Sequence, residues 1–301
     1  MKKTETHVKE IETKIDMKDD FYRYITPELT LEKQEEIAKY ILSKNENVYI
    51  NKDVLNLFQI PKEFKEKINI EKQMMQSHLD KYKKNKLYEL TSKDADVKAT
   101  NQSEKTICKR LWEQDFHYKN GERVTKPNSK ISIIDFEVPV IYSKFDVDKK
   151  TYTNNRCSGN GAVDIVAKAG NIIYLIEAKD FKSNESLLRC IAEIKTYYEK
   201  IINHKSQDTK YISAQEMFNY SYGASKIIPA IMLFKKTTPY NELKKLRNNP
   251  KKYANLSKLA KSIVFFQIEF DNNVKETNRN IPITKLKTIN FKFKVLNNNK
   301  H

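Results

Sequence analysis

The fold of this chain is most constrained by residues 161–180, GAVDIVAKAGNIIYLIEAKD. Two apolar runs, at 162–167 and 172–176, lie on either side of the turn signal Ala-Gly-Asn at 169–171. Apolar runs of this length that are bounded by glycine and asparagine favour strands over a helix. The stretch therefore predicts a β-hairpin made of two buried strands.

Three charged residues stand inside this apolar hairpin: Asp164, Glu177 and Lys179. A charge in a buried strand is costly unless it is paired or bound to a metal. Glu177 and Lys179 are two residues apart and share a face of their strand, and Asp164 on the partner strand can lie opposite them. Two interpretations follow: a buried salt bridge around Lys179, or a Mg²⁺ site built from carboxylates, water and substrate phosphate.

The same residues resemble the signature of a known family. Val163-Asp164, followed after twelve residues by Glu177-Ala178-Lys179, resembles the motif of the restriction-endonuclease-like superfamily, the PD-(D/E)XK phosphodiesterases, with Val163 in place of the formal proline. The resemblance implies that Asp164, Glu177 and the backbone carbonyl of Ala178 hold Mg²⁺, for which Mn²⁺ is a substitute. It further implies that Lys179 positions the attacking water or stabilises the charge of the transition state.

This resemblance covers roughly residues 100–270 and implies an α/β restriction-endonuclease-like core, a central mixed β-sheet flanked by helices. The hydrophobic pattern agrees, because it predicts strand, hairpin, helix, strand, helix and strand in that order. Pro229 indicates an irregular or edge position in its strand, and residues 117–130 are expected to form a basic loop. The predicted elements are a helix at 101–116, a strand at 131–141, an amphipathic crossover helix at 187–201, a strand at 227–234, a basic helical stretch at 241–259 interrupted at Pro250, and a strand at 263–270.

Glu104 and Glu137 are secondary candidates for the site. In the family, the helix that precedes the core sheet often carries an acidic residue facing the metal, and Glu104 resembles that residue by position. The alternative for Glu104 is a capping box with Asn101. Glu137 lies in the middle of the predicted strand at 131–141, and its alternative is a solvated edge position next to Pro139.

The chain is expected to divide near residue 98. Residues 1–98 predict a mainly helical, basic N-terminal region, which includes a helix capped by Thr30, and residues 99–301 predict the nuclease-like domain. The first third contains no motif that suggests a chemistry of its own. Basic helices of this kind could bind DNA, pack on the core or form a homodimer.

The formal net charge of +17 favours polyanionic partners, nucleic acid first and membrane surfaces second. Part of this excess follows a use of lysine and asparagine along the whole chain. The three cysteines form no CxxC pair, which argues against a zinc site or a disulfide framework and for a reducing compartment. No signal-peptide pattern or apolar run of about 20 residues is present, so we expect a cytoplasmic protein without a membrane partner.

The expected function is metal-dependent hydrolysis of phosphodiester bonds by an endonuclease, with DNA favoured over RNA by analogy with the superfamily. Two alternatives remain open. One is a nucleic-acid-binding protein without catalysis, and the other is a protein-interaction subunit that uses its basic helices. No individual nucleic-acid-binding residue stands out from the sequence.

Overall fold

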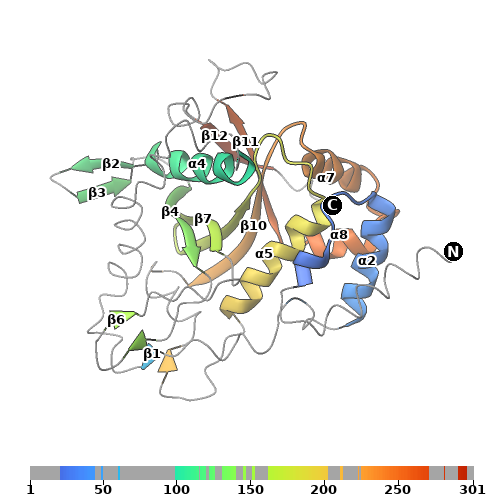
Figure 1. The fold of residues 1–301 in the computed structure, drawn as a ribbon, viewed down its shortest axis with the longest axis horizontal. Helices are drawn as coiled ribbons and strands as arrows, with labels where there is room; N and C mark the ends of the chain where they lie inside the picture. Colours follow the sequence, from blue (N-terminus) through green and yellow to red (C-terminus); the bar gives the residue numbers. More distant parts are fainter. Residues whose placement is uncertain are drawn as a thin grey trace.

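A computed structural model of the chain describes residues 21–44, 49, 60–61, 99–114, 116–119, 122–125, 131–139, 145–146, 151–152, 162–202, 211–212, 223, 225–270, 281 and 291–296. Its centre is a six-stranded mixed sheet in the order β12-β11-β10-β8-β7-β4 (Figure 1). The chain is therefore an α/β protein, as the sequence predicts, whereas the specific restriction-endonuclease-like core stays a prediction. The strands are β4 (Ser132–Pro139), β7 (Ala162–Ala169), β8 (Ile172–Ala178), β10 (Lys226–Phe234), β11 (Val264–Phe270) and β12 (Phe291–Val295).

The predicted hairpin is confirmed by β7 and β8, which pair antiparallel from Ile165↔Ile176 to Ala169↔Ile172. Their two-residue loop begins at Gly170, whose φ of 59° is a conformation that glycine adopts without a Cβ penalty. The predicted crossover is also confirmed, because α5 (Leu187–Ile202) joins β8 to its parallel neighbour β10.

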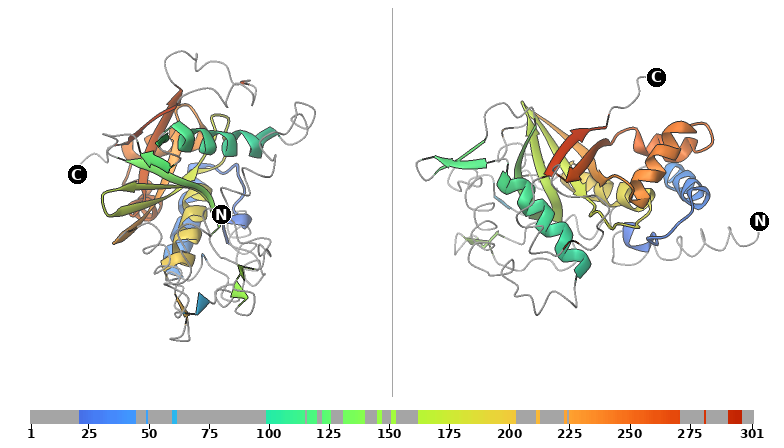
Figure 2. Two further views of the ribbon diagram at one scale, coloured as in Figure 1. Left: turned by 90° about the vertical axis from the view of Figure 1, so that its left-hand side faces the viewer. Right: turned by 90° about the horizontal axis from the view of Figure 1, so that it is seen from above.

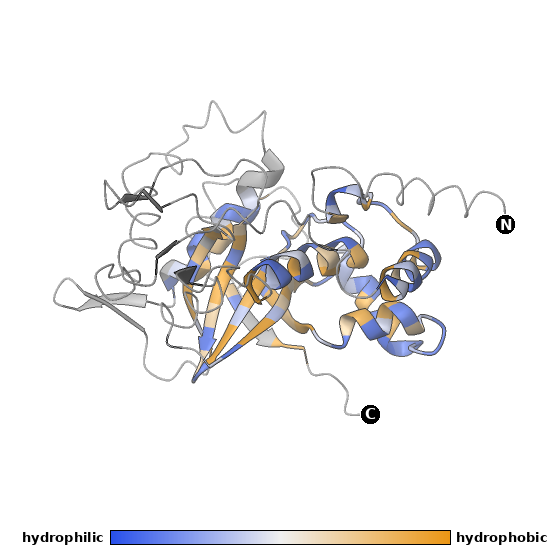
Figure 3. Cartoon of the chain, turned by 90° about the horizontal axis from the view of Figure 1, so that it is seen from below, coloured by the Kyte–Doolittle hydropathy of each residue, from blue (hydrophilic) through white to orange (hydrophobic). Residues whose placement is uncertain are grey.

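Helices cover both faces of the sheet (Figure 2). Alternate strand residues point to opposite faces. Val166 and Leu175 pack in one core with α5, whereas Ile165 and Ile176 pack in a second core with α4 (Ala99–Gln114). Figure 3 shows the corresponding pattern, with mainly hydrophobic strands and helices that carry hydrophobic and hydrophilic stripes.

The described N-terminal residues belong to the first of these cores. The 3₁₀ helix η1 (Phe21–Tyr24) packs on α5, and α2 (Leu31–Ser43) packs on α8 (Ala254–Ala260). Thr30 caps α2 as predicted, because its side chain accepts a hydrogen bond from the backbone N–H of Lys33 at 3.4 Å. The division of the chain near residue 98 stays a prediction, and most of residues 45–98 lie outside the described residues.

Two local predictions are wrong, and one is confirmed only in part. The segment expected as a basic loop contains two strands, β2 (Phe116–Lys119) and β3 (Glu122–Thr125), which pair on either side of an Asn-Gly turn signal. The edge position predicted for Pro229 is confirmed only locally: β10 has neighbours on both sides, but Pro229 itself lies before the ladder with β11 begins. Pro229 is tolerated because it pairs with Leu175 of β8 just before the ladder with β11 begins at Ala230.

The other correction concerns the helix expected at 101–116. It begins at Ala99 and ends at Gln114, so Asn101 lies inside α4 and cannot be its N-cap. The basic helical stretch is confirmed as α7 (Thr238–Asn248) and α8, with an interruption that includes Pro250. The remaining short strands are β1 (Ile60–Pro61), β5 (Phe145–Asp146), β6 (Thr151–Tyr152) and β9 (Tyr211–Ile212). Among the helices in the described ranges, none has the length and apolar character needed to cross a membrane.

Candidate metal centre

The register of the β7–β8 hairpin brings Asp164 and Glu177 together. The last ladder pair is Ile165↔Ile176, and one step further along the same register Asp164 stands opposite Glu177. Directly opposite residues of an antiparallel pair point to the same face. Where the ladder ends, Asp164 Oδ2 accepts a hydrogen bond of 2.8 Å from the backbone N–H of Ala178. Both carboxylates are buried, with exposed fractions of 9% for Asp164 and 2% for Glu177.

Glu104 of α4 completes a group of three carboxylates. One oxygen of each of Glu104, Asp164 and Glu177 lies within 4.8 Å of the others. The position of α4 is fixed because Ser103 Oγ lies 2.5 Å from Asp180 Oδ2, just past the end of β8. The capping-box interpretation of Glu104 fails because α4 begins two residues before Asn101, whereas the geometry of the carboxylates suits a divalent cation with oxygen ligands.

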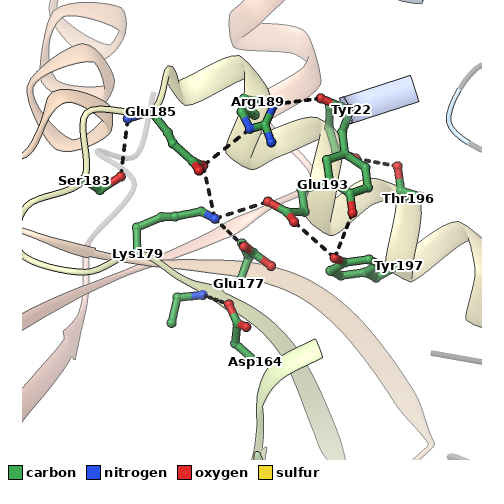
Figure 4. Close-up of polar contacts among 12 residues, drawn as sticks. Tyr22, Asp164, Glu177, Lys179, Ser183, Glu185, Arg189, Glu193, Thr196 and Tyr197 are labelled. Carbon is green, nitrogen blue, oxygen red and sulfur yellow. Dashed lines mark hydrogen bonds and ion pairs between the residues drawn. The ribbon is translucent and has the colours of Figure 1, made fainter. Parts of the chain in front are cut away.

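Lys179 lies beside this group and is surrounded by carboxylates (Figure 4). Its Nζ atom is 2.5 Å from Glu177 Oε1, 3.2 Å from Glu185 Oε2 and 3.2 Å from Glu193 Oε2. The contact with Glu177 confirms that the two residues share one face of the strand. Burial alone would lower the pKa of Lys179, but the nearby carboxylates outweigh it and hold that pKa well above its usual range. Lys179 is therefore a buried, charged ammonium group.

The pKa values of the carboxylates shift in different directions in this environment. Burial is the main cause that raises the pKa of Glu104, to about 7. Burial, followed by the charge of Asp164, raises the pKa of Glu177 well above its usual range. Burial has the same tendency at Glu193, but the charge of Lys179 outweighs it and lowers the pKa. A cation bound among Glu104, Asp164 and Glu177 would relieve the crowding that these shifts report.

Glu185, Glu193 and Tyr197 were not singled out by the sequence. Glu193 Oε1 accepts a hydrogen bond of 3.1 Å from the hydroxyl of Tyr197, one helical turn further along α5. The Tyr197 hydroxyl also lies 3.3 Å from that of Tyr22. The one sequence feature that distinguishes Glu193 is its position off the main apolar stripe of a helix that otherwise packs on the sheet.

Arg189 of α5 is half-buried and contacts the N-terminal segment. Its Nη1 atom donates hydrogen bonds to the carbonyl oxygens of Ile25 at 2.6 Å and Tyr22 at 3.4 Å. Its Nε atom also lies 3.8 Å from Glu185 Oε2. Arg189 thus ties the N-terminal segment to the helix that carries Glu193.

Two predicted ligands are placed by their backbone alone. The β4–β7 register pairs residue 136 with 165 and 138 with 163, so Glu137 stands opposite Asp164, although its side chain lies outside the described residues. The N–H of Ala178 faces Asp164, and in an extended strand the carbonyl of the same residue faces the same neighbour. The ligand roles of Glu137 and of the Ala178 carbonyl stay predictions.

No protein-family model, curated protein or solved structure matches this chain. Membership of the PD-(D/E)XK superfamily therefore stays a prediction from the motif. The case for a function depends on the residues of the site and on the charge around them.

Proposed function

We propose that this chain is a metal-dependent nuclease that hydrolyses phosphodiester bonds, with DNA as its favoured substrate. The observation that carries the proposal is the convergence of Glu104, Asp164 and Glu177 within 4.8 Å beside the buried ammonium of Lys179. Carboxylates with a lysine next to them suit a cation that itself contacts a phosphate. The net charge of +17 adds support for a polyanionic substrate.

The donor set fits Mg²⁺, with Mn²⁺ as a substitute, because it consists of carboxylate oxygens with no sulfur or imidazole. Glu104, Asp164 and Glu177 would hold the ion, which when bound supplies an activated water and stabilises charge on the phosphate. Ala178 keeps the Asp164 carboxylate oriented through its backbone N–H.

Lys179 acts as a charged hydrogen-bond donor in this scheme. Its raised pKa means that it does not act as a base near neutral pH, since the ammonium form persists there. An ammonium in this position can orient the attacking water or stabilise negative charge as it develops on the phosphate oxygens. Glu185 and Glu193 hold its Nζ atom in place, each at 3.2 Å.

The proposal is tested by incubating the purified protein with supercoiled DNA, single-stranded DNA and RNA in Mg²⁺, Mn²⁺ or EDTA. We expect cleavage in either metal and none in EDTA. Asp164→Asn keeps an acceptor for the Ala178 N–H but removes the charge, and the loss of such a charge costs about 10²-fold or more in rate. Glu36→Gln, an exposed change of the same type on α2, should cleave like the wild type.

Two outcomes contradict the proposal. Cleavage that persists in EDTA, or an Asp164→Asn protein as fast as the wild type, would mean that this site is not responsible. Nucleic-acid binding without cleavage under any of these conditions would favour the non-catalytic alternative. Absence of both binding and cleavage would favour the protein-interaction subunit.

A further inference from the structure

The segment 235–262, which contains α7 and α8, has an unusual charge. It contains nine Lys and Arg residues and a single acidic residue, Glu242, whereas the whole chain has 56 basic and 39 acidic residues. Glu242 is buried and points into the core. The excess here therefore exceeds the general use of lysine along the chain.

The positive charges lie on the outside of this helix pair. The buried positions of α7 include Leu243 and Leu246, whereas Lys244 and Lys245 are exposed on the other side. We call five exposed lysines within and directly next to these two helices the α7–α8 surface. They are Lys244, Lys245, Lys251, Lys258 and Lys261.

The α7–α8 surface is fixed relative to the candidate metal centre. The backbone N–H of Thr238, at the start of α7, donates to the carbonyl of Ser183 at 3.2 Å, in the loop that follows β8. Glu242 Oε2 accepts a hydrogen bond of 2.7 Å from the N–H of Leu187, at the start of α5. The same loop and helix carry Glu185 and Glu193, which contact Lys179.

The position of the α7–α8 surface relative to the candidate metal centre also follows from the strand order of the sheet. β8 and β10 are parallel neighbours, with Met232 paired to Ala178, so both strands end at the same edge. Lys179 follows β8 at that edge, and α7 follows β10 after a short turn. The eleven residues of α7 extend about 16 Å, a length that spans about five phosphates along one strand of a duplex.

We infer that the α7–α8 surface binds the phosphate backbone of a nucleic acid that extends away from the candidate metal centre. A lysine that contacts a phosphate does so as a point charge, and such a contact does not depend on nucleotide sequence. The inference rests on the proposed function only in identifying the bound strand as the substrate, because binding itself needs neither metal nor cleavage.

The test measures binding of a fluorescently labelled duplex DNA of arbitrary sequence in EDTA, at several salt concentrations. The variant is Lys244→Gln/Lys245→Gln, and the matched control is Lys33→Gln/Lys39→Gln, two exposed lysines on α2, where glutamates are interspersed. Each lost phosphate contact lowers the slope of log K against log salt by about 0.9. We expect this slope to become less steep by about 1.8 for the variant. The affinity of the variant for the duplex should accordingly be weaker by up to about 60-fold at 0.1 M salt.

The control should leave both slope and affinity close to those of the wild type, and circular dichroism verifies that both proteins are folded. An unchanged slope in the Lys244→Gln/Lys245→Gln variant, or an equal loss in the control, overturns the inference. Binding to anionic phosphatidylserine vesicles without binding to DNA also overturns it. The proposed function fails separately, if wild-type protein binds DNA through this surface but does not cleave it in Mg²⁺.

Discussion

Glu104→Gln should stabilise the metal-free protein, and more so at high pH. The carboxyl of Glu104 has a pKa of about 7 in the folded protein, raised mainly by burial from an ordinary value of 4.5. The folded state therefore binds more protons than the unfolded state between these two pH values, so its stability falls as the pH rises through this interval. Glutamine has a similar shape and does not ionise, so the variant avoids this loss.

The size of the effect follows from the two pKa values. Each pH unit between them corresponds to about 1.36 kcal/mol, so the cost of ionising Glu104 reaches about 3 kcal/mol at pH 8. The cost is about 1.4 kcal/mol at pH 5.5 and vanishes below pH 4.5. The stability advantage of Glu104→Gln over the wild type should therefore grow by about 2 kcal/mol between pH 5.5 and pH 8.

Urea unfolding of both proteins in EDTA at these two pH values measures the difference. Glu36→Gln, on the exposed side of α2, is the control and should show no pH-dependent advantage. Mg²⁺ should reduce the advantage of Glu104→Gln at pH 8, because a ligand at ten times its Kd stabilises the wild type by about 1.4 kcal/mol and Glu104→Gln binds it less well. The reasoning would be refuted if the difference in free energy of unfolding between Glu104→Gln and the wild type were the same at pH 5.5 and at pH 8.

Three further substitutions are tested by urea unfolding. Lys179→Ala leaves the buried Glu177 and the half-buried Glu185 and Glu193 without their cation and should cost about 3–5 kcal/mol at neutral pH. A loss below about 1 kcal/mol would contradict its role as the balancing charge. Glu242→Ala leaves the backbone N–H of Leu187 and one of the two side-chain N–H donors of Gln34 without their acceptor, while Gln34 Nε2 still donates to Leu29 O. This should cost about 2 kcal/mol or more, and a neutral result would contradict that network. Thr30→Ala removes the cap of α2 and should cost about 1 kcal/mol. Thr30→Ser keeps a hydroxyl and should retain most of the stability. Equal losses of stability in the two variants would argue against capping.

The sequence predicts elements whose signals are local. The hairpin follows from two apolar runs around Gly170, and α5 follows from apolar residues at helical spacing. The hairpin register also brings Asp164 opposite Glu177, so the pairing of these two carboxylates can be predicted from the sequence. These features require only strand alternation and helix periodicity, which neighbouring residues set.

Features that depend on tertiary packing were missed. Glu193 meets Lys179 only because α5 crosses back over the sheet, and Arg189 is covered because the N-terminal segment folds over that helix. The helix start at Ala99 was missed because the polar Asn101 looked like a cap. Pro229 indicates an irregular or edge position, and the ladder with β11, which begins only at Ala230, provides such a position inside the sheet.

The central claim is that the three carboxylates form a divalent-cation site and not only a partner for Lys179. The most direct measurement is calorimetric titration of Mn²⁺ into metal-free wild-type protein and into Asp164→Asn. The account predicts saturable binding to the wild type and a large loss of affinity in the variant, with Mg²⁺ competing for the same site. Absence of binding to the wild type, or equal affinity in both proteins, would contradict the claim and leave a buried salt bridge as the explanation.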